Sequence, residues 1–342
     1  MYVMAREGSA WKDLRPIVRG LIKAGVDLRR LILVSDDRHP GDLLARGHVD
    51  HLLRLAISEG VDPVKAVQCV TLNVAEHYRL DSELGAIAPG RHADMVVLDS
   101  LERVEVRDVY IAGSLVASKG NLLVSLRPPK YPKWAVKTMN VAKIPSLEDL
   151  VISSKNGGIA NVIGIIEHSA ITRHLEVRVN PGIIAPDPSK DLLIVTVIER
   201  HRATGNFSVG IVTGFGLSKG AVASSIAHDS HNIIAVGATP EDIHIAIKNV
   251  IEMGGGISVV KGGKSIASIA LPLAGLMTSD TAERAAKKLE HVEEGWRRLG
   301  CTIENPFMTM SLLALPVIPE LRITDKGLVD VVNMKIIPVI TR

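Results

Sequence analysis

A run of four apolar residues, Leu31–Val34, is followed after one serine by two carboxylates, Asp36 and Asp37, and then by a His39–Pro40 turn. The apolar run predicts a fully buried strand. In β/α barrels, catalytic groups stand at the C-terminal ends of such parallel strands. A carboxylate placed there can bind a metal ion or accept a proton from metal-bound water. The alternative is that the two acids only end the strand.

The segments around this strand alternate between strand and helix patterns, which indicates parallel βα units. We expect a strand at 2–5, a helix at about 11–24, and a helix that Asp42 caps and that runs to Gly60. A further helix should begin at Asp62–Pro63, because Pro is favoured at the first helical position. The predicted class is α/β, with residues 1–75 as one segment of βα units.

The rest of the chain changes character twice. Residues 76–128 contain short strand patterns separated by turn residues such as Gly85 and Gly90, and Gly113–Ser114 suits a hairpin. Residues 129–147 are rich in proline and lysine and are predicted to be a linker. Residues 148–342 are predicted to form a separate α/β (α+β) domain with strands at 192–199 and 207–213 and helices from Thr239 and from Asp280.

Composition excludes several classes of protein. The formal net charge of 342 residues is only +3 and the basic residues are scattered, which argues against nucleic acid as a partner. Cys69 and Cys301 are far apart and have no CxxC neighbours, so a reducing cytoplasm fits and a disulfide does not. No apolar run approaches the roughly 18 residues that cross a bilayer, so we expect no membrane association.

Several motifs resemble adenine deaminases of the amidohydrolase superfamily. The two most specific are the Arg6–Ser9 run and the Ala227–Asn232 run; others are Gly47–Asp50, the superfamily-wide run 85–98, Leu271–Met277 and Leu315–Glu320. The resemblance implies the last two βα units of an amidohydrolase-type (β/α)8 barrel in 1–75, a small β-sandwich segment in 76–128, and the family's C-terminal domain in 148–342. The family's earlier barrel segment, with its His-x-His pair, is not in this sequence, so we expect a truncation or one half of a split enzyme.

The resemblance also implies a reaction and a metal. Adenine deaminases hydrolyse adenine to hypoxanthine and ammonia with a divalent metal, manganese or iron, whose ligands would lie mostly on the earlier segment. It implies that Asp36 stands beside the metal, as a ligand and as the proton-transfer residue, with Asp37 as second choice. We expect the chain alone to be inactive, an N-terminal partner chain to complete the barrel, and the complete enzyme to be a cytoplasmic homo-oligomer. The alternatives are another metal-dependent amidohydrolase acting on a cyclic amide or amidine, and a non-catalytic binding module.

Two clusters are candidates for substrate binding. Glu7 and Ser9 follow the first strand and are expected at the rim of the site, although Arg6 and Glu7 can equally form a structural pair. His228, Asp229, Ser230 and His231 form a dense polar run after small residues. Imidazole and carboxylate groups can form hydrogen bonds with the ring nitrogens and the amine of adenine. The alternative for this second cluster is a closed hydrogen-bond network.

Overall fold

The computed structural model describes residues 1–127 and 129–341. The chain divides into two compact units, an N-terminal unit, Met1–Pro129, and a C-terminal unit, Lys130–Arg342. The final residues of the predicted β-sandwich segment and of the predicted C-terminal domain, Pro128 and Arg342, lie outside the described residues. In the described ranges, no helix is both long enough and apolar enough to cross a membrane.

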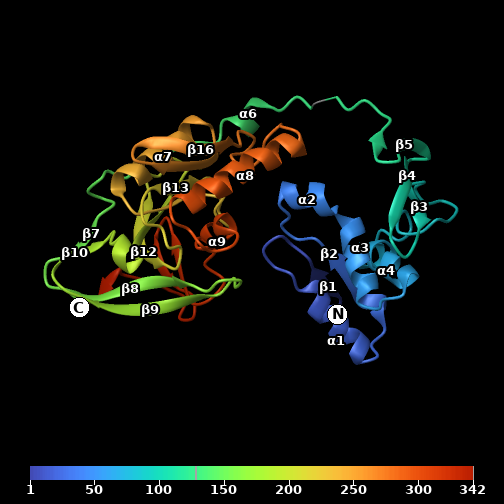
Figure 1. Cartoon of the computed structure of the whole chain (residues 1–342), viewed down its shortest axis with the longest axis horizontal. Helices are drawn as coiled ribbons and strands as arrows, with labels where there is room; N and C mark the ends of the chain where they lie inside the picture. The colour runs from blue at the N-terminus through green and yellow to red at the C-terminus, as the bar shows by residue number, and fades with distance from the viewer. Residues whose placement is uncertain (128, 342) are drawn as a thin grey trace. The chain divides into compact units, whose positions relative to one another are not determined.

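The N-terminal unit begins with the predicted βαβ arrangement. Strands β1 (Val3–Arg6) and β2 (Leu31–Val34) are parallel, with Arg6 opposite Val34, and α1 (Leu14–Lys23) connects them (Figure 1). Ala5, Leu31 and Leu33 alternate with residues of the other face, and they share one core with residues of α1. The buried strand predicted at 31–34 is confirmed. Its carboxyl end and that of β1 therefore lie at the same edge of the sheet.

The continuous helix predicted from Asp42 to Gly60 is wrong. The structure has two helices, α2 (Pro40–Arg46) and α3 (Val49–Ser58). They separate at Gly47, whose φ of 89° is left-handed, and the backbone N–H of His48 donates to the Asp50 carboxylate over 2.7 Å. Asp42 lies in the first turn of α2, and the residue that caps this helix is His39. The next helix, α4 (Pro63–Val70), begins as predicted, with the carboxylate of Asp62 accepting from Lys65 N.

The segment predicted as a small β-sandwich forms one layer. After α5 (Leu72–Tyr78), four antiparallel strands pair in sequence order, with a hairpin at Gly113; they are β3 (Met95–Ser100), β4 (Glu105–Ile111), β5 (Ser114–Ser118) and β6 (Asn121–Leu122). A sandwich requires two packed sheets, and the described residues of this segment contribute only this one. Hydrophobic side chains of β3 and β4 remain exposed, such as Val96 at 55% and Val106 at 43%.

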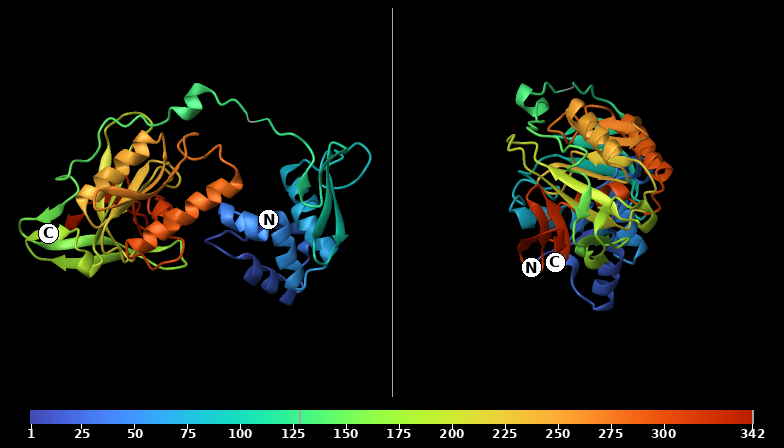
Figure 2. Two further views of the ribbon diagram at one scale, coloured as in Figure 1. Left: turned by 45° about the horizontal axis from the view of Figure 1, so that its top comes forward. Right: turned by 90° about the vertical axis from the view of Figure 1, so that its left-hand side faces the viewer.

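The C-terminal unit is built on a nine-stranded, mostly antiparallel sheet, so it is α+β in type (Figures 1 and 2). After a short helix, α6 (Lys133–Val136), its strands are β8 (Gly158–Ile165), β9 (Thr172–Val179), β11 (Leu193–Ile198), β12 (Phe207–Thr213), β13 (Ala221–Ser224), β14 (Ile233–Gly237), β15 (Gly256–Lys261), β16 (Lys264–Ala270) and β20 (Ile340–Thr341). Among the described residues of this sheet, β8 and β12 form the one parallel pair. Smaller sheets pair β7 (Ile152–Ser154) with β10 (Gly182–Ala185), and β17 (Leu321–Thr324) with β18 (Gly327–Asp330) and β19 (Lys335–Ile337).

Both faces of this sheet are covered at its central strands β11, β13 and β14, which explains why these strands are buried along their whole length. On β14, Ile233 and Ala235 belong to one core with α7 (Pro240–Glu252). Ile234 and Val236 belong to a second core with α8 (Ala282–Arg298) and α9 (Pro306–Leu312). Because successive side chains of a strand point to opposite faces, α7 and α8 lie on opposite sides of the sheet. The loop between β13 and β14 contains the second candidate cluster.

Candidate active site

Asp36 lies just beyond the carboxyl end of β2 and contacts a residue of β1. Its Oδ2 is 3.3 Å from Nη1 of Arg6, and Nε of Arg6 donates to Asp13 over 2.7 Å. The guanidinium of Arg6 also lies over the ring of Trp11, 5.6 Å from its centroid. The pairing is with two aspartates, so the Arg6–Glu7 pair considered from sequence is not formed. Arg6 thereby orients the carboxylate of Asp36, whose side chain is 38% exposed.

The backbone at Asp36 is left-handed, with a φ of 55°. Aspartate adopts this conformation more readily than most residues, and it turns the chain sharply at the end of the strand. The neighbouring Asp37 is also exposed, and its backbone carbonyl accepts from Ser9 N over 3.0 Å. The two candidate acids therefore have different surroundings. The side chain of Asp36 contacts Arg6, whereas the backbone carbonyl of Asp37 accepts from Ser9.

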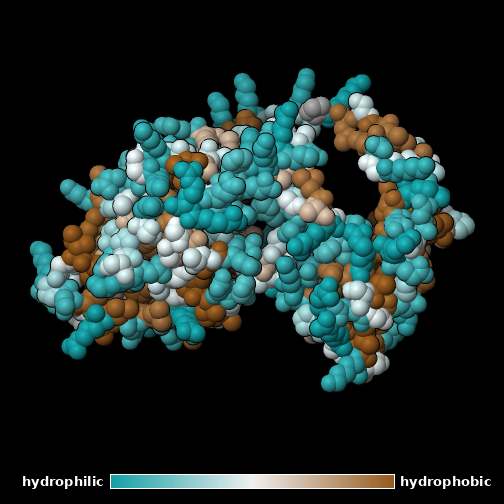
Figure 3. Space-filling view, viewed as in Figure 1, coloured by the Kyte–Doolittle hydropathy of each residue, from teal (hydrophilic) through white to brown (hydrophobic). Residues whose placement is uncertain are grey.

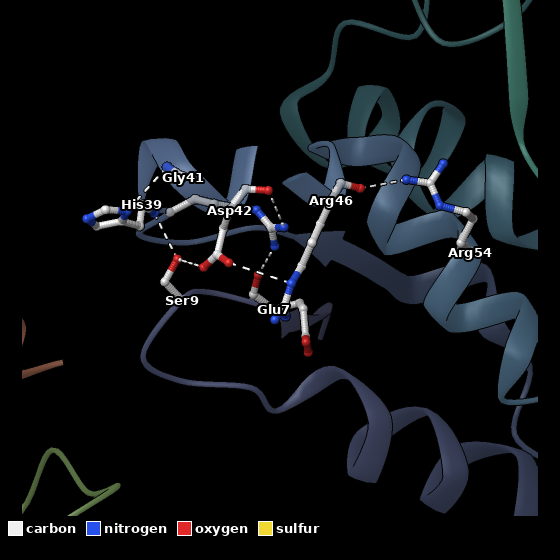
Figure 4. Close-up of polar contacts among 8 residues, drawn as sticks. Glu7, Ser9, His39, Gly41, Asp42, Arg46 and Arg54 are labelled. Atoms are coloured by element: carbon white, nitrogen blue, oxygen red, sulfur yellow. Dashed lines mark hydrogen bonds and ion pairs between the residues drawn. The ribbon is translucent and has the colours of Figure 1, made fainter. Parts of the chain in front are cut away.

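Glu7 is buried, and one of its carboxylate oxygens has no partner. Its residue exposure is 5%, and Oε2 makes no hydrogen bond. Burial raises the pKa of Glu7, although nearby cations, first Lys12 and then Arg15, partly oppose this. In Figure 4 the carboxylate points away from Asp42. Burial therefore makes the protonated form of this carboxyl group more accessible than in water, and only that form can donate a hydrogen bond.

Ser9 joins the loop after β1 to the loop after β2 (Figure 4). Its hydroxyl donates to Asp42 Oδ2 over 2.6 Å and accepts from the backbone N–H of His39 over 2.8 Å. Burial alone would raise the pKa of Asp42, but the bond from Ser9 and the charge of Arg46 outweigh it and lower the pKa. A Cβ on Gly8 would stand 3.0 Å from the carbonyl oxygen of Asp37. The absence of a side chain at Gly8 therefore allows the backbone carbonyl of Asp37 to lie close to it.

We expect Ser9→Ala to destabilise the N-terminal unit by about 1–3 kcal/mol, because the Asp42 carboxylate and the His39 N–H lose their partner. Denaturant unfolding followed by circular dichroism measures this change. Ser114→Ala, at an exposed position of the same unit, serves as control and should change stability by less than about 0.5 kcal/mol. Equal unfolding midpoints for the two variants would show that the Ser9 contacts contribute nothing.

The other histidines near this edge have structural contacts. Nδ1 of His39 accepts from Gly41 N over 3.2 Å, which caps α2. Nε2 of His48 lies 2.9 Å from the hydroxyl of Ser35. Within residues 1–127 and 129–341, no group of three or more His, Cys, Asp or Glu side chains is arranged to hold a metal ion. Asp36 is a chemically suitable oxygen ligand, but the described residues do not assemble a full ligand set around it.

The second cluster occupies the loop between β13 and β14. The rings of His228 and His231 are 5.6 Å apart, and Nδ1 of His228 is 3.3 Å from the carboxylate of Asp229. Asp229 and Ser230 are exposed, whereas Nδ1 of His231 is buried and has no hydrogen-bond partner. Buried polar atoms are nearly always satisfied in native proteins. Nδ1 of His231 is therefore a hydrogen-bonding group that no other described residue satisfies.

Two residues that the sequence reasoning missed hold this loop. Arg200 and His201 follow the buried strand β11 and contact the backbone carbonyls of His231 and Ser230. Glu199, which precedes them, accepts from the backbone N–H of His201. Burial alone would raise the pKa of Glu199, but the backbone N–H groups of Thr204, Arg202 and His201 donate to its carboxylate and bring the pKa to about 2. The available signal was the four consecutive charged or ionisable residues Glu199–Arg202 directly after a buried six-residue strand.

Comparison with known proteins places the chain in a family. The family model of the adenine deaminase C-terminal domain matches residues 169–335, and that of the amidohydrolase family matches residues 10–116. The chain is 42% identical over 334 residues to an adenine deaminase of Clostridium botulinum (strain Loch Maree / Type A3). The chain is a homologue of the adenine deaminases. The resemblance predicted from the Arg6–Ser9 and Ala227–Asn232 runs is thus confirmed.

Adenine deaminases from other organisms have a similar sequence identity to this chain. The identity is 43% with that of Moorella thermoacetica and 40% with that of Staphylothermus marinus, each over 100% of this chain and 58% of the relative. The Clostridium botulinum alignment covers 96% of this chain and 56% of that relative. The chain thus spans a little over half the length of these relatives. Among solved structures, phenylurea hydrolase B overlaps 29% of this chain and 26% of its own, with a TM-score of 0.24 and 22% identity, which is too little to bear on function.

Proposed function

We propose that this chain acts in adenine deamination, in which water attacks C6 of adenine, the amine leaves as ammonia and hypoxanthine remains. The observation that carries the proposal is the 40–43% identity to adenine deaminases over 96–100% of the chain. The alternatives are hydrolysis of another cyclic amide or amidine and a non-catalytic binding module. Adenine deaminase homologues and the amidohydrolase match imply a divalent metal. We propose manganese or iron, with Asp36 as one ligand.

In this proposal Asp36 transfers a proton. The attacking water must lose a proton and the leaving amine must gain one, so a single carboxylate can accept the first and deliver the second. The contact with Arg6 supports this role because it restrains the carboxylate at the edge where β1 and β2 end. Asp37 is the second candidate for the same step. Cytoplasmic purine salvage, an N-terminal partner and a homo-oligomeric complete enzyme belong to the same proposal.

We further propose that Glu7, Ser9 and the run from His228 to His231 contribute to adenine binding. For Glu7, the support is its burial and its unpartnered Oε2. The contribution of Ser9 would be indirect, because its hydroxyl proton already goes to Asp42. For the second cluster, the support is the buried, unpartnered Nδ1 of His231. Substrate binding by such groups is selective, because a wrong substrate leaves buried polar atoms unpaired.

The function is tested by measuring ammonia release from adenine with manganese or iron in two preparations. One is the purified chain alone, and the other is the chain co-expressed with the part of a related adenine deaminase that this chain does not match. We expect turnover in the second preparation and not in the first. Turnover by the chain alone would contradict the predicted inactivity. Turnover in neither preparation would contradict adenine deamination and leave the binding module as the better account.

His231→Ala tests the second cluster in the active preparation. We expect kcat/KM for adenine to fall about 10- to 100-fold with an unchanged melting temperature, because loss of one hydrogen bond leaves its partner on the substrate unpaired. His291→Ala, at an exposed position of α8, is the control and should leave kcat/KM unchanged. A lowered melting temperature with normal kinetics for His231→Ala would instead show a closed structural network.

A further inference from the structure

The loop that contains His228 and His231 is held by the residues that follow β11. Nε of Arg200 donates to the backbone carbonyl of His231, and Nε2 of His201 lies 2.7 Å from the carbonyl oxygen of Ser230. Consecutive side chains thus hold consecutive carbonyls of the loop. The backbone at His231 has a left-handed φ of 51°, which a histidine adopts less readily than a glycine. The loop conformation therefore depends on contacts from outside it.

Arg200 ties this loop to two other segments. Its Nη1 donates to the carbonyl of Thr138 over 3.1 Å, and its Nη2 donates to the carbonyl of Ala274 over 3.1 Å. The residue is 1% exposed, and its side chain donates to three carbonyls instead of forming an ion pair with a carboxylate. Burial lowers the pKa of Arg200 to about 10. A buried charge is costly unless its hydrogen bonds are made, so the three carbonyls account for its presence here.

The surrounding chain is shaped to admit this guanidinium. A Cβ on Gly275 would stand 2.9 Å from Nη1 and 3.0 Å from Cζ of Arg200. The hydroxyl of Ser225 donates to the carbonyl of Gly275 over 2.6 Å, which fixes that turn. Arg200 is therefore packed as tightly as a core residue and has little freedom to move. A rigid donor of this kind can hold a loop in one conformation.

We propose that Arg200 is the positioning residue of the His228–His231 pair, holding the loop so that the two imidazoles lie with their centroids 5.6 Å apart and Nδ1 of His231 is kept as a hydrogen-bonding group for a neutral nitrogen heterocycle. The ligand class rests on the proposed function, whereas the positioning role does not. The second guanidinium of this kind in the unit, on Arg322, donates to the carbonyls of Leu312, Ile318 and Pro319 and contacts Ala170. In the described part of the chain, the Arg322 side chain makes no hydrogen bond to residues 228–231, so it provides a matched comparison.

The pKa of His231 depends on the charges near it, so it reports on the contact with Arg200 and is not changed by a general loss of stability. Burial lowers the pKa of His231, as do the neighbouring His228, Arg200 and His201, while Asp229 opposes them. If Arg200 is replaced by a neutral residue, a lowering charge disappears and the ring gains solvent. The pKa of His231 should then rise toward its ordinary value of 6.5.

The experiment is NMR titration of the imidazoles in the 342-residue chain and its variants Arg200→Met, Arg200→Lys and Arg322→Met. We expect the pKa of His231 to rise in Arg200→Met and to stay unchanged in Arg322→Met, even though both lower the melting temperature. Amide exchange at His231, whose N–H donates to Ala227 over 2.6 Å, should become about tenfold faster in both Arg200 variants. Arg200→Lys keeps the positive charge but not the hydrogen bonds to three carbonyls, so the pKa of His231 in this variant should stay close to that in the parent chain.

An unchanged His231 titration and unchanged amide exchange in folded Arg200→Met would overturn the positioning role. If Arg200→Met does not fold, Arg200→Lys decides through amide exchange, and normal protection at His231 in that variant would also overturn it. None of these measurements uses adenine. A confirmed positioning role together with normal kcat/KM in His231→Ala would therefore contradict only the proposed adenine binding.

Discussion

Asp36→Asn is expected to reduce adenine turnover by about two to four orders of magnitude in a preparation of this chain that deaminates adenine, because the amide cannot accept the proton in the transfer that we propose for Asp36. Asparagine also tolerates the left-handed backbone, so the φ of 55° at this position should be kept. The measurement is kcat from ammonia release, with circular dichroism to establish that the variant is folded.

Two variants separate proton transfer from the loss of a charge pair. Asp13→Asn removes the other carboxylate that Arg6 contacts and should leave kcat within a few-fold of the parent, since surface pairs contribute about 0–1 kcal/mol. Asp37→Asn changes the adjacent acid and should also be mild. If Asp37→Asn is the crippling change and Asp36→Asn is mild, the roles of the two acids are reversed.

The second large effect concerns the core of the C-terminal unit. Trp296 of α8 is fully buried and stacks on Phe215 with their ring centroids 5.5 Å apart. We expect Trp296→Ala to lower the free energy of unfolding of this unit by about 3–5 kcal/mol, because the truncation removes apolar contact and leaves a cavity. Denaturant unfolding followed by far-ultraviolet circular dichroism measures this without relying on tryptophan fluorescence.

Trp134 gives a control of the same residue type. It lies on α6 and is 76% exposed, so Trp134→Ala should change the free energy of unfolding by no more than about 0.5 kcal/mol. The expected difference between the two variants is therefore several kcal/mol. A Trp296→Ala protein with the stability of the parent would show that this part of the core repacks without a cavity.

Local patterns predicted most of the elements that frame both clusters. The apolar run Leu31–Val34 and the strand at 207–213 are confirmed at their predicted bounds, and the helix that Asp62 begins is confirmed with its cap. The continuous helix from Asp42 to Gly60 was wrong because a single left-handed glycine, Gly47, and its neighbour's bond to Asp50 interrupt it. Apolar periodicity continues across such a break and does not reveal it.

The roles assigned to Asp36, Asp37, Glu7, Ser9 and the run 228–231 stay predictions, but their surroundings could not have been read from sequence. The partners that define them are distant along the chain, as with Arg6 and Asp36 or Ser9 and Asp42. The same holds for Arg200, which donates to carbonyls of Thr138, His231 and Ala274. A sequence pattern does not state which distant backbone carbonyl a buried side chain will reach.

By itself, the sequence determined the family through its motifs. It also determined most of the succession of strands and helices and the carboxylates beyond the end of β2, because the spacing of apolar residues follows from backbone geometry. The tertiary structure alone decided that the predicted sandwich segment is one sheet, that Glu7 is buried with a raised pKa, and that Arg200 holds the His231 loop. The physical reason is that burial and hydrogen-bond partners arise from packing between segments far apart in the chain, and packing sets both the desolvation of a charged group and the donors within its reach.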